Sequence, residues 1–431
     1  MPGAVQLKAS YLGYEAMQKD ATVVASQAIT IEFRLQPTVA KKEKEVLITA
    51  ERPLVEVSKA STTRSFNSEE LKNLTIDPTL DSVVEQQPGV TRDNNQIHIR
   101  GGRSEETLFI VDGVQMRDVL SGDSEGKNVS ARSVAEVNII TGGFDAKYGQ
   151  ALSGIVEAKL KEGGETYQGY VGMQTDELWD GWNTRQVDFQ IGGPLPLADR
   201  WLAPLAGRGS SRPTFFLNVA SDISDGYLPS IRDLPGDYHL QSAYQDRLFG
   251  KKFDYGRFFT PGADNDWRLL WKSAWKASTN HKFVFSATKA LSFNQGFSDI
   301  DVSETNRNKI NYPWAWSQLL QRYSTVTNDQ NSMVLSWTHT ARAHLFHTVK
   351  ATRYFSARHT SVDGKLWDKL DPSVFVDASG NEGSLYFVSD RSASDFRIRS
   401  TRTWALDWDW QYKSPRHDVQ WGGRAQYEDV S

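Results

Sequence analysis

The sequence predicts a mainly β chain that contains part of an antiparallel transmembrane β-barrel, an α+β domain before it, and the remnant of a small β-sandwich at the start. Three observations predict this class. Long segments that alternate apolar and polar residues begin at residue 165. Their connections alternate between tight turns and long loops. The residues before 165 instead combine short helical patterns, short strands and glycine turns.

The composition excludes several classes of protein. The chain has 431 residues, a formal net charge of −4, no cysteine and 14 tryptophans. Without a basic excess, binding to nucleic acid is not expected. The absence of cysteine excludes disulfides and thiolate chemistry in this sequence. No run of roughly 18 or more apolar residues is present, so no membrane-spanning helix is predicted.

The first two predicted regions are a sandwich remnant at 1–37 and a linker at 38–58. Q-A-I-T-I-E-F-R-L alternates as a strand does, but too few strands are present for a complete sandwich, and we expect that domain to begin before Met1. The linker is charged and aperiodic except for one short apolar segment. Such an extended segment can add a strand to a partner's sheet edge, or it can pack as a last strand on the first domain. This segment consists of Glu45, Val46, Leu47, Ile48, Thr49 and Ala50.

Residues 59–164 predict a compact α+β domain. Residues 68–87 have helical patterns, with Pro78 expected in the first turn of the second helix. The strands I-H-I-R-G-G-R, L-F-I-V-D-G-V, V-N-I-I-T-G-G-F and G-I-V-E-A-K-L follow. Three stretches supply the candidate site residues, called here the signature residues: Ile99, Arg100, Gly101, Gly102, Val111, Asp112, Gly113, Glu136, Gly142, Gly143, Tyr148, Gly149 and Gly154.

Physical roles can be predicted for some signature residues. Arg100 is a candidate for a buried ion pair with a carboxylate of the barrel, because a desolvated charge must be paired. Asp112 and Gly113 predict a turn, in which Asp accepts backbone hydrogen bonds and Gly adopts a positive φ. We expect the glycines at 142, 143 and 149 to permit close backbone approach between the domain and the barrel.

Residues 165–431 predict the first strands, about nine, of an incomplete barrel. The expected strands are 165–175, 184–193, 213–222, 265–278, 281–295, 330–341, 345–358, 398–412 and 417–431. One end of this sheet would carry tight turns and the other the long loops at 223–264, 296–329 and 359–397. Because bacterial barrels usually have an even number of strands, we expect the chain to continue past Ser431.

Alternating side chains place the aromatic residues on one face of these strands. In W-A-L-D-W-D-W-Q-Y (404–412) the tryptophans share one parity, and Asp407 and Asp409 share the other. Strand length and connection pattern favour an inverted arrangement, with the aromatic face toward lipid and the polar face toward a wet lumen. The expected lipid-facing aromatics are Trp267, Trp271, Trp275, Trp404, Trp408, Trp410 and Trp421.

Three ordered motifs resemble the plug domain of TonB-dependent outer-membrane receptors. They are I-R-G-G (99–102), L-F-I-V-D-G-V (108–114) and the long stretch 134–164, which holds the remaining signature residues. G-G-P-L-P (192–196) is similar to the first periplasmic turn of that family, and residues 45–50 occupy the position of its TonB box. The first strands resemble a carboxypeptidase regulatory-like domain.

This resemblance implies a receptor that imports a substrate across the outer membrane without breaking any bond in it. Energy from the inner membrane would reach the plug through the TonB box. The implied partners are a TonB-type energy-transducing protein, outer-membrane lipid, an imported glycan, peptide or metal chelate, and a surface lipoprotein. The plug and N-terminal domain would face the periplasm. No enzymatic activity, cofactor, metal or nucleic acid is expected.

Two other classes stay open on the sequence alone. A soluble, multi-domain β-rich protein that binds or cleaves glycans would bury the aromatic parity or use it as a sugar platform. A passive porin would need neither a plug nor a TonB box. A metal site at His339, His344 and His347 is less expected than solvated turn histidines. Lumen solvation likewise explains Asp407 and Asp409 better than acid–base chemistry.

Overall fold

The computed structural model describes part of the chain. The described residues are 3–9, 17–23, 31, 33, 63–73, 79–93, 96–118, 129–144, 148–149, 151–175, 185–224, 264–294, 324–342, 345–362, 397–414 and 417–431. The TonB-box-like segment at 45–50 and His344 lie outside these residues.

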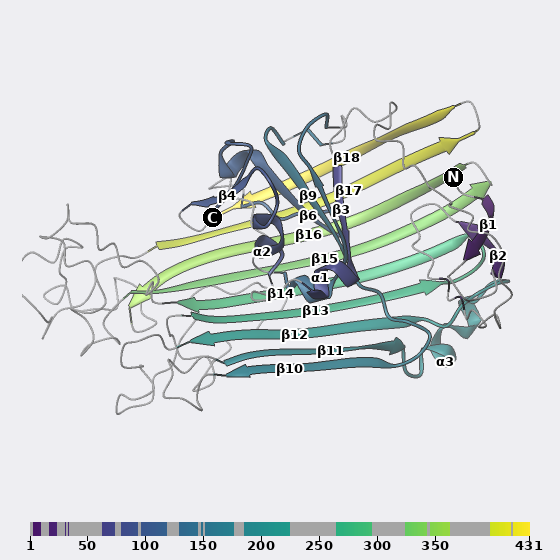
Figure 1. Cartoon of the computed structure of the whole chain (residues 1–431), viewed down its shortest axis with the longest axis horizontal. Coiled ribbons are helices and arrows are strands. Elements are labelled where there is room, and N and C mark those ends of the chain that lie inside the picture. The colour runs from purple at the N-terminus through teal and green to yellow at the C-terminus, as the bar shows by residue number, and fades with distance from the viewer. Residues whose placement is uncertain are drawn as a thin grey trace, which may run out of the picture.

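The largest element is an antiparallel sheet of nine strands whose spatial order equals their order in the chain (Figure 1). Long strands form because β-branched and aromatic residues alternate with polar ones over the whole length of each segment. This confirms the predicted fold class. The strands are β10 (Gln168–Thr175), β11 (Arg185–Pro194), β12 (Thr214–Ser224), β13 (Asp264–Lys276), β14 (His281–Asn294), β15 (Ser324–Arg342), β16 (Leu345–Val362), β17 (Arg397–Lys413) and β18 (Asp418–Val430).

Every predicted strand is present, and the main difference is length. β15 begins at Ser324 instead of 330, and β16 ends at Val362 instead of 358. These ends are rich in Thr, Asn, Ser and His, so their polarity resembled loop sequence, but continuous pairing between Ser324 and Val362 makes them strand. Strands of 17 to 19 residues at β15–β17 exceed what a bilayer core requires.

The tight turns lie at one end of the sheet, on the right in Figure 1. β13 and β14 are joined through a turn in which Ser278 and His281 exchange backbone hydrogen bonds. Ser414 and His417 close the turn between β17 and β18. The connection between β11 and β12 lies at the same end and contains two short helices, α3 (Ala198–Leu202) and η4 (Ala203–Leu205).

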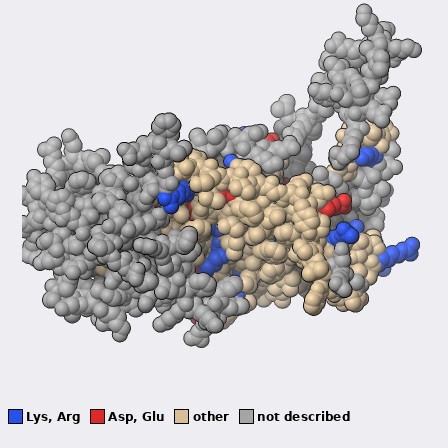
Figure 2. Space-filling view, turned by 90° about the horizontal axis from the view of Figure 1, so that it is seen from below, with Lys and Arg blue, Asp and Glu red and all other residues tan. Residues whose placement is uncertain are grey.

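The nine-stranded sheet β10–β18, called the wall below, has an apolar outer face and a polar inner face. Leu269 and Trp408 are 45% and 50% exposed, whereas Arg268 and Lys272 are only 8% and 5% exposed. A soluble protein shows the reverse arrangement, since burying charge costs free energy and burying apolar surface gains it. Figure 2 shows a broad stretch of the described surface with few charged side chains. This pattern is the one that a lipid-facing wall requires.

A second unit, formed by residues 63–160 where the structure describes them, lies against the polar face of the large sheet (Figure 1). Its five-stranded sheet has the order β3-β8-β9-β6-β7, with β6 and β9 parallel. A separate hairpin pairs β4 with β5. The bounds are β3 (Thr63–Asn67), α1 (Ser68–Asn73), α2 (Leu80–Glu85), β4 (Val90–Asp93), β5 (Gln96–Ile99), η1 (Ser104–Glu106), β6 (Thr107–Val111), β7 (Val114–Gln115), η2 (Ala131–Ser133), β8 (Val134–Ile140) and β9 (Gly154–Leu160).

This smaller unit has its own apolar core. Leu80, Ile99 and Phe109 are almost fully buried in it. Helix α2 begins at Leu80 because the Thr79 side chain caps it by accepting a hydrogen bond from the Ser82 amide. A compact core of this kind lets the unit keep its shape when it contacts the wall.

At the N-terminal end, the structure describes one hairpin of β1 (Gly3–Ala9) and β2 (Met17–Val23). It lies near the turn end of the large sheet (Figure 1). A carboxypeptidase regulatory-like domain and the domain boundaries at 37, 58 and 164 stay predictions. Among the described helices, none is long and apolar enough to cross a membrane.

Candidate functional site

The centre of the candidate site is the two-residue turn between β6 and β7. Asp112 and Gly113 both have positive φ, at 49° and 91°, as a primed hairpin turn requires. Val111 and Val114 pair on either side of the turn. The Asp112 carboxylate accepts a hydrogen bond from the Leu160 amide at 3.1 Å, which ties the turn to the end of β9. The predicted turn role of this Asp-Gly pair agrees with this geometry.

One buried lysine of the wall binds this turn. Lys272 of β13 lies with its Nζ 3.0 Å from Asp112 Oδ2 and 3.1 Å from Oδ1. The same ammonium donates to the Leu160 carbonyl at 3.0 Å. The two side chains are 6% and 11% exposed, so both charges are desolvated and each depends on the other. The contact therefore fixes the position of the smaller unit against the wall.

A second carboxylate extends this contact to the next strand. Glu162 lies 3.8 Å from Lys272 and 3.0 Å from Lys282 of β14. Because Glu162 and Lys282 are more exposed than Lys272, their ion pair stabilises less than the buried one. Lys272, Lys282, Asp112 and Glu162 together are called the ion network below.

Apolar side chains pack beside the ion network. Phe216, Leu270, Val334 and Tyr354 point from the wall into the core of the smaller unit. They belong to β12, β13, β15 and β16, on the parity that otherwise carries polar residues. The contact is thus a joint core, and charge alone does not hold it.

Two further ion pairs connect the smaller unit to strands near the two lateral edges of the sheet, β11 and β17. Arg132 lies 3.8 Å from Asp188 of β11, and its guanidinium lies over the Tyr170 ring of β10. Asp118 lies 2.9 Å from Arg399 of β17. Charged contacts therefore join the unit to strands on both sides of the ion network.

Arg100 is exposed beside the nine described strands, and its predicted ion pair with a barrel carboxylate stays a prediction. Arg100 has φ of 52° and an exposed side chain, because it stands at the turn after β5. Asp112 makes the buried contact with the wall instead, and its partner is a lysine. Of the neighbours of Arg100, Ile99 is fully buried, and Gly101 and Gly102 continue the turn.

Close approach to the wall occurs at glycines other than those predicted. A side chain at Gly113 would overlap Lys350 Nζ of β16, and one at Gly163 would overlap the Phe215 backbone of β12. Among the described residues, no atom lies within 4 Å of the position that a Gly149 side chain would take. The closest neighbour of Gly142 is Arg100, inside the same unit, and Gly143 is required for its φ of 64°. Gly142 and Gly149 thus do not approach the nine described strands closely, and the expected close approach at 142, 143 and 149 stays a prediction for the rest of the barrel.

The other signature residues lie within the smaller unit. Gly154 leaves room for Ile99, and the Tyr148 hydroxyl donates to Glu157 at 3.3 Å. Glu136 is 3.0 Å from Lys159 and accepts from Asn138. Partial burial raises the pKa of Glu136, but these two hydrogen bonds and the Lys159 charge outweigh burial and lower the pKa overall. These residues shape the unit and do not contact the wall in the described part of the chain.

The predicted lipid-facing aromatics lie on the outer parity of their strands. Trp404, Trp408 and Trp421 are about half exposed. The other four, Trp267, Trp271, Trp275 and Trp410, are more covered, because rings of neighbouring strands pack against several of them. Trp271 stacks on Phe215 at 5.3 Å, and Trp410 stacks on Trp421 at 5.8 Å. On the opposite parity, Asp407 pairs with Arg424 at 3.6 Å, whereas Asp409 is exposed.

Histidines join this aromatic surface near the turn end. His281, His339 and His347 are register neighbours on β14, β15 and β16. The His281 and His339 rings are parallel within 3° at 4.4 Å, and Trp337 donates to His281 Nδ1. Lone pairs in parallel ring planes do not converge on one point, so this stack does not fit a metal ion. Within the described residues, no group of three or more candidate ligands could hold one. His339 and His347, which the sequence predicted as solvated turn histidines, are instead part of the outer aromatic face, and His344 lies outside the described residues.

Lys272 is the site residue that the sequence interpretation did not single out. Several lysines of the barrel strands share its parity, and the partner Asp112 is 160 residues away. One signal could have found it: a lysine between Leu270 and Ala274 on the inner parity is a charge in an otherwise apolar stretch.

A lipid-facing wall that carries a separate folded unit on its polar face defines a plugged outer-membrane barrel. Comparisons with known proteins agree. Residues 56–155 match the family described as the TonB-dependent Receptor Plug Domain. A stretch of 91 residues, 21% of this chain and 8% of the relative, is 33% identical to the TonB-dependent transporter Oar of Myxococcus xanthus. These matches confirm the resemblance that the three motifs predicted, and the smaller unit is called the plug from here on.

Solved structures show the same fold. The siderophore receptor PirA of Acinetobacter baumannii matches with a TM-score of 0.55 and 16% identity, over 85% of this chain and 48% of that one. The outer membrane transporter YddB of Escherichia coli matches with a TM-score of 0.54 and 12% identity, over 85% and 48%. The chain spans about half the length of these structures and 8% of Oar. The predicted location in the outer membrane, with the plug toward the periplasm, is in agreement with these comparisons.

Proposed function

We propose that the full-length protein is a TonB-dependent outer-membrane transporter that imports a substrate with energy transduced from the inner membrane. The observation that supports it most is the plug itself, which matches the TonB-dependent receptor family and contacts the polar face of the wall through a buried ion pair. A plug held in a lumen closes it at rest, so transport requires work on the plug.

The work would enter through residues 45–50, the TonB-box-like segment. Its apolar alternation suits strand addition to an energy-transducing partner. The segment precedes β3, which is the edge strand of the plug sheet. Pulling there would load the plug from that edge, while the ion network resists at β13 and β14.

The substrate remains one of three classes: a glycan, a peptide or a metal chelate. PirA is described as a siderophore receptor, but at 16% identity that likeness concerns the fold alone. A surface lipoprotein partner is also part of the proposal. No catalytic step is proposed, and TonB-dependent receptors are transporters and receptors rather than enzymes.

The test is growth of the native host on panels of glycans, peptides and ferric chelates as sole carbon, nitrogen or iron source. Deleting the gene identifies the condition that needs the protein. Deleting residues 45–50 in the full-length protein should abolish growth under that same condition, with normal protein levels in the outer membrane. Normal growth of the deletion strain would favour a passive porin. Recovery of the full-length protein from the soluble fraction, without detergent, would favour the soluble glycan-binding alternative.

A further inference from the structure

The connection between β11 and β12 carries apolar side chains on its surface. Residues 195–213, called the insertion below, form this connection at the turn end of the wall and contain α3 and η4 (Figure 1). Trp201 is 80% exposed, the highest fraction of any large apolar side chain in the described residues, and Leu197 and Leu205 are 68% and 69% exposed. They are spaced by four residues, the interval at which side chains of helical turns share a side. An exposed apolar group of this kind indicates a contact surface.

A row of aromatic rings crosses the outer face of the wall at the same end. His281, His339, His347, Trp410 and Trp421 occupy successive register positions on β14 to β18. The centroids of neighbouring rings are 4.3 to 5.8 Å apart. Rings that carry a polar nitrogen prefer the boundary between hydrocarbon and lipid head groups. The row therefore indicates where the wall crosses this boundary on its turn side, which faces the periplasm.

The backbone holds the insertion at the height of this row. Hydrogen bonds of 2.8 to 3.1 Å join residues 207–211 to residues 276–279, which comprise the last residue of β13 and part of the turn that leads to His281. The Leu195 amide donates to the Pro213 carbonyl at 2.7 Å and closes the base of the insertion. Because His281 belongs to the aromatic row, the insertion lies beside the boundary between hydrocarbon and head groups.

The insertion is also positively charged. It contains Arg200, Arg208 and Arg212 against one acidic residue, Asp199. Arg208 and Arg212 are exposed. Segments that lie in the plane of a membrane interface combine Trp and Leu with basic residues, because the apolar side chains enter the acyl region while the cations meet lipid phosphates. A soluble partner or a second copy of the chain would require no match between the insertion and the height of the aromatic row.

We propose that the insertion is a membrane anchor that binds anionic phospholipids of the periplasmic leaflet. Leu197, Trp201 and Leu205 enter the upper part of the acyl chains. Arg208 and Arg212 contact the phosphate groups. The anchor fixes the depth of the turn end of the wall in the membrane. This role goes beyond the proposed transport function and does not depend on it, because it needs only the location in the outer membrane.

The test uses the full-length protein, reconstituted into vesicles of phosphatidylcholine and phosphatidylglycerol. A small fluorophore is attached to a single cysteine, and lipids with a nitroxide on the upper acyl chain serve as quenchers. The 431 residues contain no cysteine, so each new thiol is the reporter in this part of the chain.

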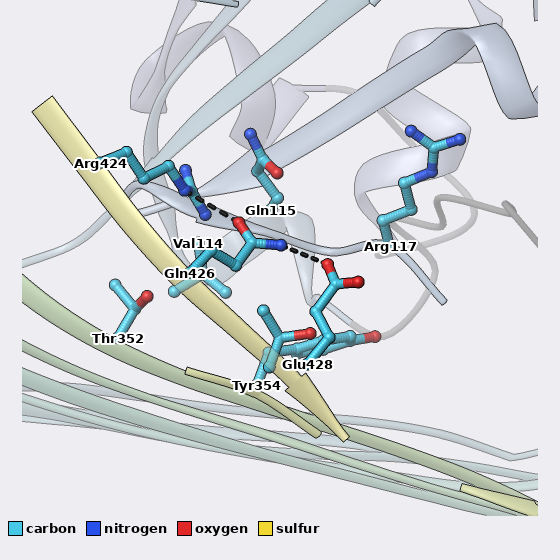
Figure 3. A pocket seen from close by; sticks show the side chains of 9 residues that line it. Val114, Gln115, Arg117, Thr352, Tyr354, Arg424, Gln426 and Glu428 are labelled. Carbon is cyan, nitrogen blue, oxygen red and sulfur yellow. Dashed lines mark hydrogen bonds between the residues drawn. The ribbon is translucent and has the colours of Figure 1, made fainter. Parts of the chain in front are cut away.

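Three positions are compared. Trp201→Cys tests the insertion, and Trp408→Cys, on the outer face of the wall, is the reference for lipid contact. Gln426→Cys is the control inside the lumen, since Gln426 lines a recess between β18 and the plug residues Val114 and Gln115 (Figure 3).

The nitroxide lipid should quench the fluorophore at Trp201→Cys several-fold more than at Gln426→Cys, and moving the nitroxide to the end of the acyl chain should weaken this quenching. Quenching no stronger than in the lumen would overturn the anchor and leave the transport proposal intact. Two further outcomes would also overturn it. A disulfide between two copies of Trp201→Cys in place of lipid quenching would identify a second chain as the occupant. Protection from both lipid and aqueous iodide would identify another part of the same chain.

A second measurement tests the choice of lipid. With the fluorophore at Trp201→Cys, nitroxide-labelled phosphatidylglycerol should quench more than nitroxide-labelled phosphatidylcholine, and Arg208→Gln with Arg212→Gln should remove this difference. Arg64→Gln with Arg103→Gln is the matched control, because these two exposed arginines belong to the plug and the same charge is lost. Equal quenching by both lipids before substitution would overturn the binding of anionic head groups. A difference that survives Arg208→Gln with Arg212→Gln would overturn the role of these two arginines.

Discussion

Replacing Lys272 by Met should loosen the plug without unfolding the wall. The substitution keeps most of the length of the side chain and removes the ammonium that binds Asp112 and the Leu160 carbonyl. Removing one partner of a buried ion pair costs about 3–5 kcal/mol. Asp112 keeps its hydrogen bond from the Leu160 amide, so we expect the lower end, about 3 kcal/mol.

Hydrogen–deuterium exchange of the full-length protein in detergent measures this change. A loss of about 3 kcal/mol in the opening free energy raises exchange by roughly a hundredfold. The increase should be confined to the β6–β7 turn and the end of β9. Lys276→Met is the matched control, because Lys276 lies on the same strand and parity but outside the ion network. The double variant Lys272→Met with Asp112→Asn should exchange more slowly than Lys272→Met alone, since no charge is left unpaired. If exchange in Lys272→Met stays within a few-fold of the wild type, the ion network does not hold the plug.

Three further predictions concern the turn glycine of the plug, the lipid-facing side of the wall and the Glu136 carboxylate. Gly113→Ala should destabilise the plug by about 1–3 kcal/mol, because φ is 91° and the methyl group would overlap Lys350. Gly149→Ala, with open space among the described residues around it, should change the free energy of unfolding little. Unfolding of the plug in denaturant measures both changes. Trp408→Arg should reduce the folding free energy by about 2–4 kcal/mol when the full-length protein refolds into lipid vesicles. Arginine in place of Asp409, which lies on the opposite parity, should reduce it much less. Equal reductions would contradict the lipid-facing assignment. The pKa of Glu136 is lowered from 4.5, so its stabilisation of the plug is present above that value and is lost as the pH falls through the folded-state pKa. Glu136→Gln should therefore reduce plug stability at neutral pH by at most about 1 kcal/mol and have no effect in strong acid. A larger loss of stability in acid than at pH 7 would contradict this prediction.

Much of the wall was predictable from the sequence. Successive side chains of a strand alternate between faces, so the parity of Trp404 and Asp407 is enough to point them in opposite directions. Tight and long connections gave the strand order, since consecutive strands joined by short turns must be neighbours. The plug was predictable from its glycine-containing motifs, and the Asp112–Gly113 turn from the conformations that only a few residues adopt.

The position of the plug against the wall was not predictable, because it depends on contacts between residues far apart in the chain. The alternation of side chains shows that Lys272 points into the lumen, but several other lysines and arginines of the wall also point there. Only the packing of the plug against the wall determines which of these cations contacts Asp112. The same packing brings Gly113 and Gly163 close to the wall, and no local motif indicated these two contacts. Local chemistry thus determined which face each residue occupies, and the tertiary structure decided which residues on that face meet, since that choice is set by the shape of both surfaces together.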